Sequence, residues 1–178
     1  MTGYLTENQI EYVFYHLSYH VDAKTFGVIR SCSFFSRKNE LPESSHRIVF
    51  QLSSAPFNID EVLLFDRIPI LFPIDRQKKI YTHFNGHLIF HHDIIKSVFY
   101  LLSGLQEYNS PKKDVYGRFP YEASVQHKLG IIHKPIVNYY FEIMLDGVEK
   151  FCRDNNLYFR KSLLFDNWKV MLTHDVDH

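Results

Sequence analysis

The stretch KIYTHFNGHLIFHHDIIKSVFYLL, residues 79–102, constrains the fold of this chain more than any other part of it. Two β-prone runs flank Asn85-Gly86, a dipeptide that favours the positive φ angles of a two-residue hairpin turn. Asp93 is a preferred N-cap residue, and the strongly apolar run behind it predicts a helix that ends near Tyr108. We therefore expect an antiparallel hairpin that leads directly into a buried helix. Gly104 is the one residue of this run with a low helix propensity.

Two further helices are predicted, one near each end of the chain. Thr6 and Gln9 have the spacing of a capping box. One face of the helix behind Thr6 is apolar at helical spacing, with Ile10, Val13, Phe14 and Leu17. The segment 137–156 is the longest amphipathic pattern, and Pro135 fits at or just before its first turn.

Several segments are predicted to be extended. Residues 26–36 are β-prone, and residues 46–53 (HRIVFQLS) are a strand candidate. In residues 60–75, Pro69 and Pro73 permit extended structure at a sheet edge but exclude a long helix. Residues 170–173 form the last predicted strand.

The interspersed strands and helices indicate an α/β chain, more closely a mixed α+β fold with one mixed β-sheet flanked by helices. We expect a single domain over residues 1–168. The stretch 169–178 then corresponds to the first strand of a second domain, a barrel of which this sequence holds only the start.

Composition bears on the partners. Lys plus Arg and Asp plus Glu both number 20, so the formal net charge is zero and nothing indicates nucleic acid or an anionic membrane as a partner. The 16 Phe and 12 Tyr predict a thick aromatic core. The alternative is a carbohydrate-binding module, in which exposed aromatic faces stack on sugar rings.

The sequence also predicts the cellular compartment of the protein. Glu7, Asn8 and Gln9 stand where a secretory signal would need its apolar core. No apolar run reaches the roughly 18 residues of a membrane span. Cys32 and Cys152 are far apart and belong to no CxxC pair, which favours reduced thiols. We therefore expect a cytoplasmic protein without a membrane span.

The most reactive-looking residues are in VMLTHDVDH, residues 170–178. Asp175 and Asp177 are two residues apart, so in an extended strand they point the same way and can converge on one ion or one substrate atom. Ligands commonly bind at the C-terminal ends of strands in α/β enzymes. Two such carboxylates suit a division of labour, one holding a divalent metal and the other acting as general base on a metal-bound water.

The heptapeptide LTHDVDH resembles the first motif of polysaccharide deacetylases, the carbohydrate esterase family 4. In that family the first Asp of the motif is the catalytic base and the second binds the metal. The resemblance implies these roles for Asp175 and Asp177, with His174 and Arg118 as supporting candidates. The common motif has two adjacent aspartates, whereas Val176 separates them here. The family's metal-binding histidines come from a later motif, so we expect no tightly bound zinc in this chain alone.

The upstream region also has a counterpart. FYLLSGLQEY, GRFPYEASVQHKLG and KPIVNYYFEI are similar to the uncharacterised N-terminal domain that precedes the deacetylase domain in many Bacteroidetes-type proteins. This resemblance spans nearly the whole chain and brings no catalytic residues with it. It implies a non-catalytic accessory domain whose partners are its own C-terminal deacetylase domain and that domain's glycan substrate. A homodimer is also compatible with it.

Other readings of the terminal motif remain open. A hydrophobic strand followed by DxD also begins haloacid-dehalogenase-type phosphatases, in which the first Asp is the nucleophile. A strand end whose acidic residues simply face solvent is the third reading. Trp168, at the start of the strand, is expected to be partly buried against the domain.

Two other patterns carry predictions. His83, His87 and His91 recur every four residues, as metal ligands on a helix would. The Asn-Gly turn instead predicts that His83 and His87 lie on opposite hairpin strands. Arg118 in RFPY is expected to fix its own loop through backbone carbonyls or a carboxylate, and a role beside the deacetylase site is the alternative.

Overall fold

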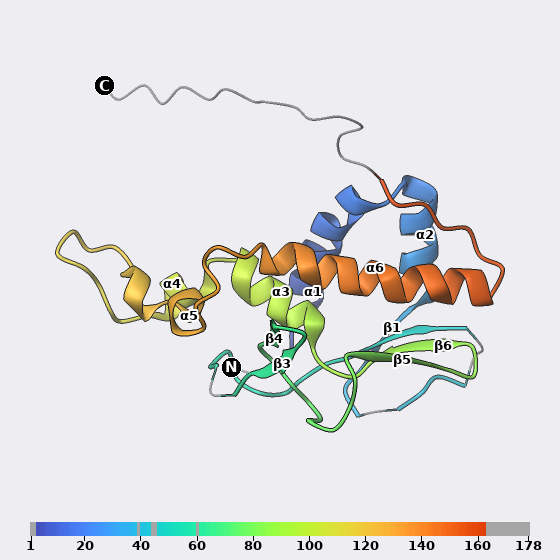
Figure 1. The fold of residues 1–178 in the computed structure, drawn as a ribbon, viewed down its shortest axis with the longest axis horizontal. Helices are drawn as coiled ribbons and strands as arrows, with labels where there is room; N and C mark the ends of the chain where they lie inside the picture. The colour runs from blue at the N-terminus through green and yellow to red at the C-terminus, as the bar shows by residue number, and fades with distance from the viewer. Residues whose placement is uncertain (1–2, 39, 44–45, 60, 163–178) are drawn as a thin grey trace, which may run out of the picture.

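A four-stranded mixed β-sheet is the centre of the fold (Figure 1). The computed structural model describes residues 3–38, 40–43, 46–59 and 61–162. The strands follow the order β1-β2-β6-β5, with both pairings of β2 parallel and the β5–β6 hairpin antiparallel. Their bounds are β1 Ser33–Ser36, β2 Ile48–Gln51, β5 Tyr81–Phe84 and β6 His87–Phe90.

A small second sheet pairs β3 (Leu63–Phe65) with β4 (Ile68–Ile70) in antiparallel register. The helices, in chain order, are α1 (Glu7–Leu17), the 3₁₀ turn η1 (Ser18–His20), α2 (Ala23–Cys32), α3 (Ile94–Leu102), α4 (Leu105–Asn109), the 3₁₀ turn η2 (Tyr121–Ala123), α5 (Val125–Lys128) and α6 (Ile136–Asp154). These elements confirm the predicted mixed α+β class.

Helix α6 lies across one face of the main sheet, with α1 and α3 in the same layer (Figure 1). It packs closely on the sheet at Gly147. A Cβ atom there would lie 3.1 Å from Leu88 Cδ1 and 3.4 Å from Phe90 Cζ. Glycine therefore lets the α6 backbone rest directly on the side chains of β6.

An aromatic core fills the space between the helices and the sheet, as the composition predicted. Phe50 stacks on Phe90 with 5.0 Å between ring centroids, and Phe14 meets the Phe50 ring edge-on at 5.8 Å. Phe35 lies against both Phe14 and Phe50. Several tyrosines nevertheless stay exposed on the helices and loops.

The local signals with explicit capping or turn chemistry are confirmed. Thr6 and Gln9 form the complete capping box of α1. Asn85 and Gly86 have φ angles of 49° and 79°, as a two-residue hairpin turn requires. Asp93 caps α3, accepting a hydrogen bond from the Lys96 backbone N–H at 2.9 Å.

Two boundaries were predicted wrongly. Residues 26–32 belong to α2 and not to a strand, because Asp22 caps a helix here by accepting from Thr25 N–H at 2.8 Å. Thr25 and Ile29, one helical turn apart, are buried together, and this packing outweighs β propensity. The helix behind Asp93 ends at Leu102, because Gly104 takes a left-handed φ of 64° before α4 begins.

Cys32 and Cys152 are free thiols, in agreement with the prediction. Burial raises the pKa of the Cys152 thiol to about 11, so this thiol stays protonated at neutral pH. In the part of the chain that the structure describes, no helix has the length and apolarity that crossing a membrane demands.

Candidate functional site

The acidic residues predicted to carry chemistry, Asp175 and Asp177, lie outside the described residues, as do His174 and Trp168. Their proposed roles stay predictions. The structure therefore informs on two other places: the loop around Arg118 and the histidines of the hairpin.

Arg118 lies in the loop between α4 and η2 and binds the Asp114 carboxylate, as one of its two predicted roles required. Its Nη2 atom is 3.0 Å from Asp114 Oδ2, and its Nε–H donates to the same oxygen at 3.1 Å. Asp114 also accepts from the backbone N–H groups of Tyr116 and Arg118. These bonds hold the pKa of the Asp114 carboxyl below its usual range. Arg118 thus orders its own loop.

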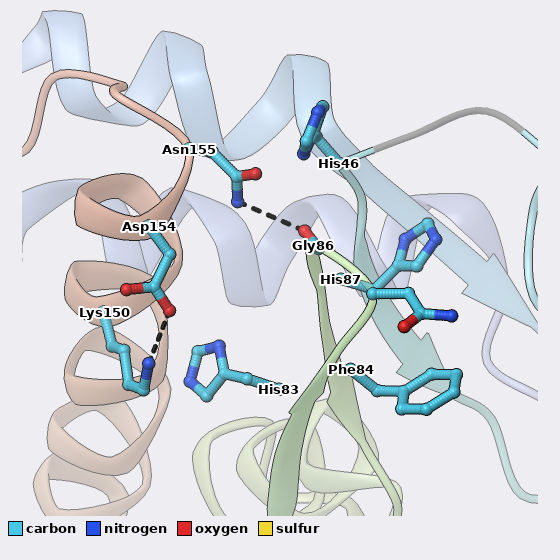
Figure 2. A pocket seen from close by; sticks show the side chains of 9 residues that line it. His46, His83, Phe84, Gly86, His87, Lys150, Asp154 and Asn155 are labelled. Carbon is cyan, nitrogen blue, oxygen red and sulfur yellow. Dashed lines mark hydrogen bonds and ion pairs between the residues drawn. The ribbon is translucent and has the colours of Figure 1, made fainter.

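A polar hollow at the tip of the β5–β6 hairpin is the candidate binding site (Figure 2). It has a volume of about 430 Å³. Three segments meet there: the turn before β2, the hairpin tip and the C-terminal end of α6. The lining residues are His46, His83, Phe84, Asn85, Gly86, His87, Lys150, Asp154 and Asn155.

Asn155, the C-cap of α6, fixes one wall of the hollow. Its side-chain Nδ2 donates to the Gly86 carbonyl at 3.1 Å and to the Phe151 carbonyl at 2.9 Å, which ties the helix end to the hairpin turn (Figure 2). A Cβ atom on Gly86 would lie 2.8 Å from the Nδ1 atom of the exposed His46 ring, so any other residue there would displace this imidazole. The turn residue therefore has two functions, its positive φ and the close approach of an imidazole.

His83 projects from β5 toward the ion pair between Lys150 and Asp154 on α6 (Figure 2). Burial lowers the pKa of His83, the nearby Lys150 ammonium lowers it further, and Asp154 opposes both effects. The imidazole is therefore neutral at pH 7. Its Nε2 atom is buried and has no hydrogen-bond partner among the described residues.

His87 lies on the other side of the hairpin. Phe84 and His87 are register partners, whereas His83 is opposite Leu88. Successive residues of a strand alternate between faces, so His83 faces α6 with Leu88 while His87 faces away from it (Figure 2). The Nδ1 atom of His87 accepts the Arg47 backbone N–H at 3.2 Å, and burial lowers the pKa of its imidazole.

The prediction that His83 and His87 lie on opposite strands is thus confirmed, and the pleat also separates their faces. His91 is directed elsewhere, since its Nε2 atom lies 2.8 Å from the Thr82 hydroxyl. No group of three His, Cys, Asp or Glu side chains could hold a metal ion within the described ranges between residues 3 and 162. What the hollow offers is a set of hydrogen-bonding groups, with a neutral imidazole beside an ammonium–carboxylate pair.

Sequence reasoning missed the α6 residues of this site. Lys150 and Asp154 have the i,i+4 spacing of a helical ion pair, a signal that indicates an exposed helix face and nothing more. Asn155 is a common helix-end residue. Their meeting with the hairpin tip depends on the angle at which α6 crosses the sheet, which no local pattern contains.

The comparisons with known proteins give one match. A family of unknown function, DUF7033, matches residues 4–152. The search of curated proteins returned no match, and the search of solved structures returned none either. The match covers α1 through most of α6, including the hairpin, and it ends before Asp154 and Asn155 of the polar hollow. The chain therefore belongs to the family of unknown function DUF7033.

Proposed function

We propose that residues 1–168 act as a non-catalytic accessory domain of a polysaccharide deacetylase. The observation that carries the proposal is the sequence LTHDVDH, residues 172–178, which follows the family domain and resembles the first deacetylase motif. The proposal includes a cytoplasmic location and two partners, the chain's own C-terminal domain and an acetylated glycan.

In this proposal the second domain hydrolyses N-acetyl or O-acetyl groups of a glycan. A divalent metal such as zinc supplies a bound water of lowered pKa in sites of this kind. Asp177 is the proposed ligand from this chain, and Asp175 is the proposed base that takes the proton of the attacking water. The remaining ligands are assigned to sequence that follows residue 178.

The structural roles of the histidines and of Arg118 support an accessory function for the described residues. His91 and His92 are buried hydrogen-bonding groups of the domain. His83 and His87 lie on opposite faces of one hairpin. Arg118 is engaged by a carboxylate of its own loop. These side chains therefore contribute to the architecture or to ligand contact, in keeping with a domain that supports a catalytic neighbour.

Acetate release tests the proposal. The 178-residue chain should release no acetate from acetylated chitooligosaccharides, and calorimetry should show no zinc or cobalt binding tighter than about 1 µM, roughly 8 kcal/mol. A polypeptide that continues through the downstream histidines should bind the metal and release acetate. Asp177→Ala should then remove most of the affinity, and Asp175→Asn most of the rate. Equally tight metal binding by the short chain would refute the proposal.

A carbohydrate-binding module is the second candidate, and the exposed tyrosines favour it. Tyr108, in α4, is 85% exposed, and Tyr116, on the loop that Asp114 orders, is 78% exposed. The Arg118 guanidinium lies 4.8 Å from the centroid of the Tyr116 ring, a cation–π contact that leaves most of this side chain open to solvent. Chitooligosaccharide titration of the 178-residue chain, followed by NMR, separates the two candidates. Saturable shifts that Tyr116→Ala abolishes support the module.

A further inference from the structure

An ordered row of aromatic side chains lies open to solvent on the outer face of α1 and η1. We call Tyr12, Tyr15, His16 and Tyr19 the tyrosine row. Its three tyrosines are 38%, 58% and 44% exposed, respectively. Neighbouring rings touch edge-on along the row: Tyr12–His16 at 4.8 Å, Tyr15–His16 at 5.5 Å and Tyr15–Tyr19 at 5.2 Å between centroids.

The row is fixed to the body of the domain. The ring of Tyr12 meets Phe99 of α3 at 5.9 Å, and its hydroxyl donates to the Leu102 carbonyl at 3.4 Å. The hydroxyls of Tyr15 and Tyr19 are hydrogen-bonded to each other. Tyrosines that are already ordered lose little conformational entropy on binding, and exposed aromatic rings are the residue type enriched at protein interfaces.

The described chain ends beside this row. The Ser162 N–H donates to the His20 carbonyl at 2.9 Å, one residue beyond Tyr19. Lys161 forms a β-bridge with Val21, and Arg160 N–H donates to the Thr25 hydroxyl at 2.8 Å. Three consecutive residues are therefore held against η1 and α2, so the position of Ser162 is determined by the domain.

Chain length limits where a second domain can lie. Six residues, 163–168, separate Ser162 from the proposed start of that domain at residue 169. A chain spans at most about 3.6 Å per residue, so residue 169 lies within about 25 Å of Ser162. A barrel of about 250 residues has a radius of gyration of about 18 Å. The row, about 10 Å long at 1.5 Å per residue, is adjacent to Ser162 and within reach of such a body.

We propose that the tyrosine row is the docking surface for the chain's own deacetylase domain. This inference rests on the proposed function, which supplies the partner. A recess of about 340 Å³ lies between His20 and the Glu142–Asp146 stretch of α6, and Ser162 forms part of its wall. A domain that begins a few residues after Ser162 is within reach of this recess as well as of the row.

Two other occupants fit the row less well. A sugar ring stacks on an open aromatic face, whereas the edge-on contacts of the row cover part of those faces. A stable dimer buries about 800 Å² on each partner, which three partly exposed tyrosines do not supply. A tethered domain needs less contact, because the linker keeps its effective concentration high.

Tyrosine footprinting tests the inference. The 178-residue chain and the full-length polypeptide are treated with N-acetylimidazole, and the modification of each tyrosine is read by mass spectrometry. Tyr15 and Tyr19 should react several-fold less in the full-length protein. Helix α4 and the loop after it lie at the other end of the domain from α2 (Figure 1), so Tyr108 and Tyr116 of this segment should react equally in both and are internal controls.

Acetate release by the same zinc-loaded full-length sample separates the two hypotheses. Release combined with equal reactivity of Tyr15 and Tyr19 in both proteins overturns the docking inference and leaves the proposed function standing. Absence of release overturns the proposed function, and the inference with it. In a sample that holds only the 178-residue chain, protection of Tyr15 and Tyr19 that rises with protein concentration would assign the row to contact with a second copy. That result also overturns the inference.

A variant pair gives an independent readout. The double variant Tyr15→Ser/Tyr19→Ser of the full-length protein should undergo proteolysis between the domains several-fold faster than wild type. The matched variant Tyr108→Ser/Tyr116→Ser should be cleaved at the wild-type rate. Unfolding curves of both variants in the 178-residue chain establish that the domain itself remains folded. Equal cleavage rates for the two variants contradict the inference.

Discussion

Asp93, the N-cap of α3, and Lys96, one turn later, are both fully buried, and each is hydrogen-bonded chiefly to backbone groups. The Asp93 carboxylate accepts N–H hydrogen bonds from Ser53 at 2.7 Å and from Lys96 at 2.9 Å. The Lys96 ammonium donates to the carbonyls of Gly3, Ser53 and Ala55. It also lies 4.6 Å and 4.8 Å from the ring centroids of Phe57 and Phe72, respectively. The pair thus joins α3 to the N-terminal segment and to the loop after β2.

Lys96→Met should destabilise the domain by about 3–5 kcal/mol, the range for removing one partner of a buried charge pair. The substitution leaves three carbonyls without their donor and removes the cation nearest to Asp93. Urea unfolding at pH 7 measures the loss. Lys113→Met, in an exposed loop, is the control and should change stability by no more than about 0.5 kcal/mol. Equal midpoints for the two variants would show that the buried ammonium contributes nothing.

Asp93→Asn should change how stability depends on pH. Burial raises the pKa of Asp93 from 3.8 to about 6, against the opposing effect of its amide hydrogen bonds and of Lys96. The folded state therefore binds this proton more tightly than the unfolded state. The resulting stabilisation is fully present below pH 3.8 and is lost as pH rises through 6, by roughly 3 kcal/mol.

The measurement is the difference in unfolding free energy between wild type and Asp93→Asn at several pH values from 4 to 7. This difference should fall as pH rises, because asparagine keeps one acceptor oxygen and has no proton to lose. A difference that rises over the same interval would mean that Lys96 and the amide donors hold the carboxylate ionised.

The contribution of His92 to folding stability should depend on pH in the opposite direction to that of Asp93. Its Nδ1 atom accepts the Ile74 N–H, and its Nε2 atom lies 3.3 Å from the Lys78 carbonyl, an arrangement that only the neutral ring satisfies. Burial lowers the pKa of this imidazole below 6.5. Its stabilisation is therefore present above pH 6.5 and is lost as pH falls. Relative to His92→Gln, wild type should lose stability between pH 6.5 and 5 in urea unfolding, and parallel curves would contradict this.

The local features predicted correctly from the sequence are those whose chemistry is complete within a few residues. The N-cap Asp93 accepts from an amide three residues ahead, Arg118 binds a carboxylate four residues behind it, and the Asn85-Gly86 turn is self-contained. For each of these, the chemistry that fixes the geometry could be recognised in one short segment.

The features that failed depend on distant contacts. Residues 26–32 are β-prone in isolation, yet they form α2 because burial of Ile29 outweighs that preference. The polar hollow brings together His46, His83 and Lys150, from three separate segments. The packing of α6 on the hairpin creates this site, and the close contact of Gly147 with Leu88 and Phe90 is part of that packing.

Gly147→Ala should therefore destabilise the domain by about 1–3 kcal/mol, the usual effect of overpacking a core. The added methyl group would meet Leu88 Cδ1 at 3.1 Å and Phe90 Cζ at 3.4 Å, so these buried side chains, or α6 itself, must move by a few tenths of an ångström. Gly27→Ala is the matched control, because Gly27 is inside α2 and a Cβ atom there meets nothing within 4 Å. Alanine should stabilise that helix by roughly 0.5–1 kcal/mol. Thermal and urea unfolding should therefore show a loss of stability for Gly147→Ala and a gain for Gly27→Ala. A stabilising Gly147→Ala would place α6 farther from the sheet than the structure has it.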